Sequence, residues 1–138
     1  NLLKYQYSGL GTVEVGLGRG LGQSTGEEQP SDLVARFGGD EFALILPETT
    51  AELVMDRLER LRAAVADARV LLAGDRSGKP VQVTLSIGVA NWPDDGPRIH
   101  LVLAAADARL YEAKRRGRNR IVGPAQDAEL REVGAENA

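Results

Sequence analysis

Two adjacent glycines followed by two acidic residues form the segment of the chain with the clearest chemical potential. They are Gly38, Gly39, Asp40 and Glu41. Paired glycines put no side chain between the backbone and a ligand, so their N–H groups can face phosphate oxygens. A carboxylate beside them can hold Mg²⁺, which prefers oxygen ligands and shares them with substrate phosphates. This combination predicts metal-assisted phosphoryl transfer from a nucleotide, although the same residues could form only a hairpin turn with solvated charges.

Two basic residues near the end of a later segment form a second candidate group. Lys114 and Arg118 are four positions apart, so both can lie on one side of a helix end. Beside a triphosphate, two cations would neutralise charge and orient the leaving pyrophosphate. Taken alone, the pair is better explained as a solvated basic helix end, which the helix dipole favours.

The elements that would position these residues can be predicted from the alternation of apolar and polar side chains. Strands at residues 33–37 and 43–46 would flank a hairpin turn at 38–41, because glycine accepts positive φ without steric cost. Thr49 or Thr50 can cap an amphipathic helix that runs to about residue 69.

The second half predicts a strand at residues 81–89, a helix at 100–116 that ends at Gly117, and a short strand at 120–122. Strands followed by helices in this order indicate an α+β fold with a mainly antiparallel sheet and packed helices.

Composition limits the possible classes of protein. The chain has 138 residues, enough for one domain, and 43% of them are hydrophobic, which suits a globular core. A net charge of −3 gives no reason to expect binding to nucleic acid or to a membrane surface. The chain has no cysteine, which excludes disulfides and thiolate metal sites and fits a cytoplasmic location. We find no apolar run of membrane-spanning length.

The first quarter of the chain reads differently from the rest. Glycine recurs so often between residues 9 and 26 that a regular helix is disfavoured. We therefore expect a diverged or loop-like segment at residues 1–31, one domain at 32–123, and a flexible C-terminal tail at 124–138.

Three motifs in order resemble the GGDEF family of diguanylate cyclases. They are residues 32–46 (DLVARFGGDEFALIL), 86–90 (SIGVA) and 106–119 (ADARLYEAKRRGRN). The resemblance covers about residues 29–123 and implies a nucleotide-cyclase-like fold that is incomplete at the N-terminus. It also implies that two GTP molecules are condensed into cyclic di-GMP across a homodimer, each 3′-hydroxyl attacking the other molecule's α-phosphate.

The resemblance assigns roles to the turn residues. Gly38 and Gly39 would lie against the GTP phosphates, Glu41 would be a catalytic metal ligand for Mg²⁺ or Mn²⁺, and Asp40 would share the catalytic acidic turn. It also favours the phosphate role for Lys114 and Arg118. A sensor domain would precede the domain in the full-length protein.

Two departures from the family pattern bear on the expected activity and on its inhibition by product. The family's second metal-binding aspartate, in an Asp-x-Asp-x-Phe-Lys pattern, would by spacing fall before Asn1, and residues 1–16 contain no match to the guanine-reading motifs. We therefore predict weak or absent cyclase activity. In the family's product-inhibition motif, Asp32 is present but Gln29 replaces an arginine, so we predict weak product binding there.

Three hypotheses follow from these observations. The first is a diguanylate cyclase domain, which the intact turn and the two cations favour. The second is a degenerate GGDEF domain that binds nucleotide or regulates a neighbouring domain, which the unmatched first segment favours. The third is a purely structural or dimerisation domain.

Overall fold

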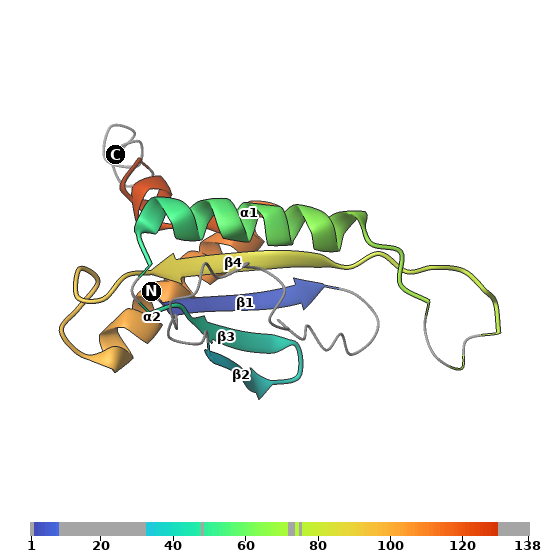
Figure 1. Cartoon of the computed structure of the whole chain (residues 1–138), viewed down its shortest axis with the longest axis horizontal. Helices are drawn as coiled ribbons and strands as arrows, with labels where there is room; N and C mark the ends of the chain where they lie inside the picture. Colours follow the sequence, from blue (N-terminus) through green and yellow to red (C-terminus); the bar gives the residue numbers. More distant parts are fainter. Residues whose placement is uncertain (1, 9–32, 48, 72–73, 75, 130–138) are drawn as a thin grey trace, which may run out of the picture.

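Within the described residues, five strands and two long helices make up the fold (Figure 1). A computed structural model describes residues 2–8, 33–47, 49–71, 74 and 76–129. In chain order the elements are β1 (Leu2–Ser8), β2 (Leu33–Gly38), β3 (Glu41–Ile45), α1 (Ala51–Asp67), β4 (Thr84–Ala90), α2 (Ile99–Arg115) and β5 (Ile121–Val122). Within the described residues, neither helix is long and apolar enough to cross a membrane.

The strands form one mainly antiparallel sheet. Their order is β2-β3-β1-β4-β5, and only the pairing of β4 with the edge strand β5 is parallel. Strands β3 and β4 therefore both pair with β1, which lies between them. The predicted α+β class with a mainly antiparallel sheet and packed helices is confirmed.

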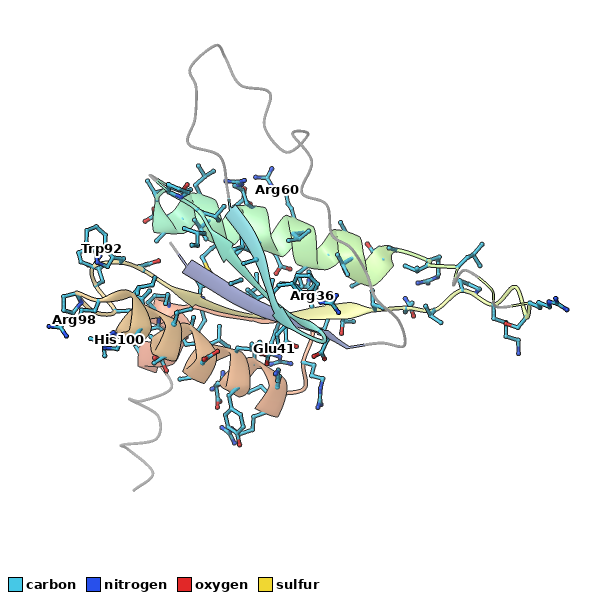
Figure 2. The ribbon with its side chains drawn as sticks, turned by 90° about the horizontal axis from the view of Figure 1, so that it is seen from below. Arg36, Glu41, Arg60, Trp92, Arg98 and His100 are labelled. Atoms are coloured by element: carbon cyan, nitrogen blue, oxygen red, sulfur yellow. The ribbon has the colours of Figure 1, made fainter. Side chains whose placement is uncertain are left out.

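The sheet lies between the two helices, with α1 on one face and α2 on the other (Figure 2). The larger core, on the α1 side, contains Phe42, Leu44, Leu46, Val54, Leu58, Val83, Leu85, Ile87 and Val89. A smaller core on the α2 side contains Ala90, Val102 and Ala106. Successive side chains of β4 thus point alternately toward α1 and toward α2, because this strand is covered on both faces.

Gly88 determines how closely α2 approaches the sheet. A β-carbon built on Gly88 would lie 2.1 Å from the Ala106 carbonyl oxygen and 2.4 Å from the Leu110 backbone nitrogen. The backbone of α2 therefore lies directly on the backbone of β4, as only glycine permits. This contact sets the distance between α2 and the sheet at Ala106 and Leu110.

A buried arginine in the same part of α2, Arg109, ties the helix to three other segments. Both terminal nitrogens of Arg109 donate to the Asp95 carboxylate at 2.8 and 2.7 Å, and one also donates to the Val89 carbonyl at 2.8 Å. Its Nε lies 3.3 Å from an Asp127 oxygen. The guanidinium thus ties α2 to the end of β4, to the loop that follows it, and to the C-terminal segment.

The structure departs from the expected segments at both ends of the chain. The segment at residues 1–31 was expected to be loop-like, yet Leu2–Ser8 is the central strand of the sheet. At the other end, residues 124–129 are helical rather than a flexible tail. There the Gln126 side chain accepts a hydrogen bond from the Gly123 N–H at 3.0 Å. The rest of both segments lies outside the described residues.

Candidate functional site

The site begins at the hairpin that joins β2 and β3. Gly38 pairs with Glu41, which leaves Gly39 and Asp40 as the two turn residues. Gly39 has φ +33°, in the left-handed region that residues with a β-carbon disfavour. Apart from its chain neighbours, no described residue has an atom within 4 Å of the place where its β-carbon would be, so the space above the turn is open.

Arg36 holds this turn in shape. Its Nε and one terminal nitrogen donate to the carbonyl oxygen of Gly39, at 3.1 and 2.8 Å. Two hydrogen bonds from one guanidinium to the Gly39 carbonyl fix the orientation of the peptide group between Gly39 and Asp40. Arg36 belongs to the hairpin motif, but no role could be assigned to it from the sequence, because its contact depends on how the side chain folds back over the turn (Figure 2).

Glu41 and Lys114 meet although they come from different elements. Lys114 Nζ on the last turn of α2 lies 4.0 Å from Glu41 Oε1, and the two side chains are 28% and 38% exposed. At this distance and exposure, an ion pair contributes little to stability. The pair therefore places a cation and a carboxylate together at an accessible position beside the Gly39 turn.

Glu112 separates the basic residues of this helix end into two groups. It accepts hydrogen bonds from Arg115, at 2.9 Å for each of two nitrogens, and from Arg116, at 2.6 Å. These bonds lower the pKa of the Glu112 carboxyl to about 2, so it is ionised at neutral pH. Glu112 thus engages Arg115 and Arg116, while Lys114 is directed to Glu41.

Arg118 occupies a strained turn that follows α2. The N–H of Gly117 donates to the Lys114 carbonyl at 3.2 Å, and the N–H of Arg118 donates to the Ala113 carbonyl at 3.0 Å. This is the hydrogen-bond pattern of a Schellman motif, with Gly117 at φ +108°. Arg118 follows at φ +63° and Asn119 at φ +47°, and the first of these is unusual for a residue with a long side chain.

The register of the central strand shows which residue faces Glu41 across the sheet. Gln6 on β1 pairs with Glu41 on β3 and with Ser86 on β4. The family's second metal-binding aspartate is expected before Asn1, and the strand that pairs with the hairpin in this structure is Leu2–Ser8. An amide residue, rather than an aspartate, thus stands beside Glu41 in the ladder.

The acidic residues present suit a metal that is shared with a substrate. In the part of the chain that the structure describes, no three acidic or histidine side chains converge on one point. Mg²⁺ needs only one or two protein carboxylates when substrate phosphates complete its shell. Glu41, with Asp40 beside it in the turn, meets that requirement in donor chemistry.

The residues of the candidate product-inhibition site cannot be placed. Gln29 and Asp32 lie in the stretch 9–32, outside the described residues. The expected weakness of that site stays a prediction. Of the predicted phosphate and metal residues, the structure brings Glu41 and Lys114 into contact and keeps Gly39 and Asp40 in the adjoining turn.

Comparisons with known proteins agree with this geometry. A family model described as "Diguanylate cyclase, GGDEF domain" matches residues 17–120. Diguanylate cyclase A of Treponema denticola is 37% identical over 91 residues, which cover 66% of this chain and 24% of the relative. Diguanylate cyclase DgcP of Pseudomonas aeruginosa is 40% identical over 91 residues, which cover 66% of this chain and 13% of that protein. The chain therefore spans about a quarter or less of the length of these relatives.

Solved structures give the same result. The GGDEF domain of DgcB from Caulobacter crescentus, crystallised in complex with c-di-GMP, superposes with a TM-score of 0.57 at 36% identity, covering 68% of this chain and 54% of that one. The GGDEF domain of YfiN from Pseudomonas aeruginosa gives a TM-score of 0.64 at 25% identity, covering 88% and 81%. The hairpin, the sheet order and the family match over more than half of the residues lead to one conclusion: this chain belongs to the GGDEF domain family of diguanylate cyclases.

Proposed function

We propose that this domain binds GTP between the Gly39 turn and the end of α2, and condenses two GTP molecules into cyclic di-GMP at a low rate. The observation that carries the proposal is the 4.0 Å approach of Lys114 Nζ to Glu41 Oε1 beside the open turn. A cation for phosphate and a carboxylate for metal are the two charges that a nucleotide triphosphate with Mg²⁺ requires at adjacent points.

The phosphates would be held by backbone and cationic groups together. The open space above Gly39 lets a phosphate approach the backbone N–H groups of Gly38 and Gly39. Lys114 and Arg118 would neutralise the terminal phosphates and orient the leaving pyrophosphate. Arg36 would keep the turn in the shape that presents those N–H groups, since it holds the Gly39 carbonyl from the other side.

The acidic turn would hold the metal, as Mg²⁺ or Mn²⁺, through Glu41 with Asp40 nearby. When bound, such a metal neutralises phosphate charge and makes the attacking 3′-hydroxyl more acidic. The role of the protein is to keep the carboxylate beside the phosphate cradle, which the pairing of Gly38 with Glu41 achieves.

The reaction needs two copies of the site. In each step the 3′-hydroxyl of one GTP loses its proton to water, and its oxygen forms a bond to the α-phosphorus of the other GTP. The bond between that phosphorus and the oxygen that bridges to the β-phosphate breaks, and pyrophosphate leaves. One domain holds one GTP, so two domains would face each other as a homodimer. A sensor domain upstream would control that encounter in the full-length protein.

A second candidate function is nucleotide binding without turnover, as a regulatory module. The register of Gln6 opposite Glu41 favours it, because a neutral amide is a poorer Mg²⁺ ligand than a carboxylate. Low metal occupancy would leave GTP bound by the phosphate groups while the transfer step stays slow.

Two measurements on the purified chain separate these functions. Calorimetry with GTP and Mg²⁺ measures binding, and chromatography after incubation measures cyclic di-GMP. Slow product formation that Glu41→Gln abolishes, while the exposed Glu52→Gln control on α1 does not, supports the cyclase. GTP binding without product supports the regulatory module, absence of binding contradicts both, and rapid turnover contradicts the low rate.

A further inference from the structure

The turn after α2 is linked to α1 by one side-chain contact from the opposite helical layer. Nη1 of Arg62 donates to the side-chain oxygen of Asn119 at 2.7 Å. Arg62 lies on α1, which covers one face of the sheet, and Asn119 follows α2, which covers the other. The contact therefore passes around the sheet edge that β5 forms.

The Arg62 guanidinium is itself held in position. Its Nε and Nη2 donate to the two oxygens of Glu59, at 2.9 and 2.5 Å, and its side chain is 19% exposed. All three guanidinium nitrogens thus have a partner among the described residues: Nε and Nη2 bond within α1, and Nη1 bonds to Asn119 outside it. Because the guanidinium is planar, two hydrogen bonds to Glu59 fix the direction in which Nη1 points. A lysine, with a single nitrogen, cannot reproduce this geometry.

The residue that Arg62 holds is the last of three consecutive residues with positive φ. Gly117 and Asn119 tolerate such a backbone, but Arg118 between them does not favour it. A strained conformation persists only where its surroundings determine it. Toward α2, the two hydrogen bonds of the Schellman motif hold the backbone of this turn. Arg120 Nε also donates to the Arg118 carbonyl at 3.1 Å. On the far side Arg62 holds the Asn119 side chain.

We propose that Arg62 is a positioning residue for the phosphate site. It holds Asn119, keeps the left-handed turn closed, and thereby directs Arg118 and the Lys114 end of α2 toward the GTP phosphates. This inference rests on the proposed function, because it assumes that Arg118 and Lys114 bind phosphate. Arg62 itself does not touch the nucleotide.

The alternative is that Arg62 only adds stability at the surface. Its head group lies in the wall of a shallow pocket with Met55, Ile121 and Gln126, outside the hydrophobic core. Truncation therefore leaves the core intact, and a folded variant can be tested. A purely stabilising role would lower the unfolding midpoint but leave the GTP affinity of the folded protein unchanged.

The test compares both sides of the contact. Arg62→Ala and Arg62→Lys remove the guanidinium group that bonds to both Glu59 and Asn119. Asn119→Gly removes the acceptor but accepts the left-handed backbone, and Asn119→Asp keeps an acceptor oxygen. The matched control is Arg60→Ala, because Arg60 is exposed on the outer side of α1 and pairs with Asp56 of its own helix (Figure 2).

Two measurements are made on each folded variant: GTP affinity with Mg²⁺ by calorimetry, and amide hydrogen exchange at Gly117 and Arg118. We expect Arg62→Ala and Asn119→Gly each to weaken GTP binding about tenfold and to speed exchange at both amides, as loss of a charge-assisted hydrogen bond predicts. Asn119→Asp and Arg60→Ala should stay close to wild type. The double variant Arg62→Ala/Asn119→Gly should be no weaker than either single variant, because both remove the same contact.

Wild-type GTP affinity in folded Arg62→Ala would overturn the inference, and so would an equal loss in the Arg60→Ala control. If the wild-type chain does not bind GTP at all, the proposed function fails and the inference falls with it. The two failures are therefore distinguished by the wild-type measurement alone.

Discussion

Lys114 Nζ reaches to 4.0 Å from Glu41 Oε1, so the end of a helix and the start of a strand meet at one pair of opposite charges. Both side chains are partly exposed, and the pair is longer than a close ion pair. Its position beside the open Gly39 turn suits ligand binding better than stabilisation of the fold.

Replacing Lys114 by alanine should therefore affect binding more than stability. We expect a loss of GTP affinity of about tenfold or more, with a change in the free energy of unfolding below about 1 kcal/mol, since partly exposed pairs contribute little. Calorimetry and urea unfolding measure the two quantities. Arg115→Ala is the control, because Arg115 on the same helix end pairs with Glu112. A large loss of stability with unchanged affinity would contradict the assignment.

Arg36→Lys tests the fork on the Gly39 carbonyl. Lysine keeps the charge but cannot donate from two fixed nitrogens, so the turn should loosen and the Gly39 amide resonance should broaden or shift. We expect GTP affinity to fall several-fold and stability to fall by about 1 kcal/mol or less. NMR and calorimetry on the folded variant measure both. A Gly39 resonance identical to wild type would show that the fork does not shape the turn.

Alanine at Gly88 and at Gly39 should destabilise the domain for different reasons. At Gly88 the new β-carbon meets helix backbone at 2.1 Å, so α2 must move, at a cost of about 3 kcal/mol or more. At Gly39 the space is open but φ is positive, and the cost should be about 1–2 kcal/mol. Urea unfolding measures both changes. Equal and small effects at the two positions would contradict the close packing of α2 on β4.

The Asp95–Arg109 pair should make stability depend on acid pH. Burial alone would raise the pKa of the Asp95 carboxyl, but hydrogen bonds from Arg109 and from the Asn91 N–H, with the charge of Arg109, outweigh burial and lower that pKa. A carboxyl with a lowered folded pKa stabilises the fold above its unfolded pKa of about 3.9, and this stabilisation is lost as pH falls through the folded value.

Asp95→Asn should therefore cost about 1–3 kcal/mol of unfolding free energy at pH 7 and progressively less below about pH 4. Urea titrations of both proteins between pH 7 and pH 3 measure the difference. The control is Asp56→Asn, which removes an exposed partner of Arg60. A difference that is constant over the whole range would exclude titration of Asp95 as the cause.

Gln6→Asp tests whether the residue opposite Glu41 limits activity. A second carboxylate in that register position should tighten Mg²⁺ binding and raise cyclic di-GMP formation, because hard cations prefer charged oxygen ligands. Gln6→Asn keeps an uncharged amide and serves as the control. Product formation at different Mg²⁺ concentrations measures the effect. Equal rates in the two variants would mean that this position does not limit the reaction.

Local chemistry explains which parts of the structure could be predicted from the sequence. The hairpin follows from Gly38 and Gly39, and Thr50 caps α1 by accepting from the Leu53 N–H at 3.3 Å. The fourth strand was expected at residues 81–89 but spans Thr84–Ala90, and Val81 instead forms an isolated bridge with Val70. An alternating pattern shows where a strand is possible, while the neighbouring strand determines how much of it forms.

The candidate site divides in the same way. Gly39, Glu41, Lys114 and Arg118 could be proposed from motifs that are each local in sequence. The approach of Lys114 to Glu41 depends on the height of α2 over Gly88, which is a tertiary contact. The contact between Arg62 and Asn119 joins two residues that carry no pairing signal in the sequence. Strand β1 could not be predicted because its place is given by two partners that come later in the chain.

The relative position of Glu41 and Lys114 depends on β1, a segment in which we recognise no family motif. The hairpin with Glu41 pairs with one side of β1, and β4, on which α2 and Lys114 rest, pairs with the other. Among the described strands no direct ladder joins β3 to β4. The seven residues Leu2–Ser8 are therefore the backbone connection between the two halves, and a change in their sequence can alter the spacing of the two charges.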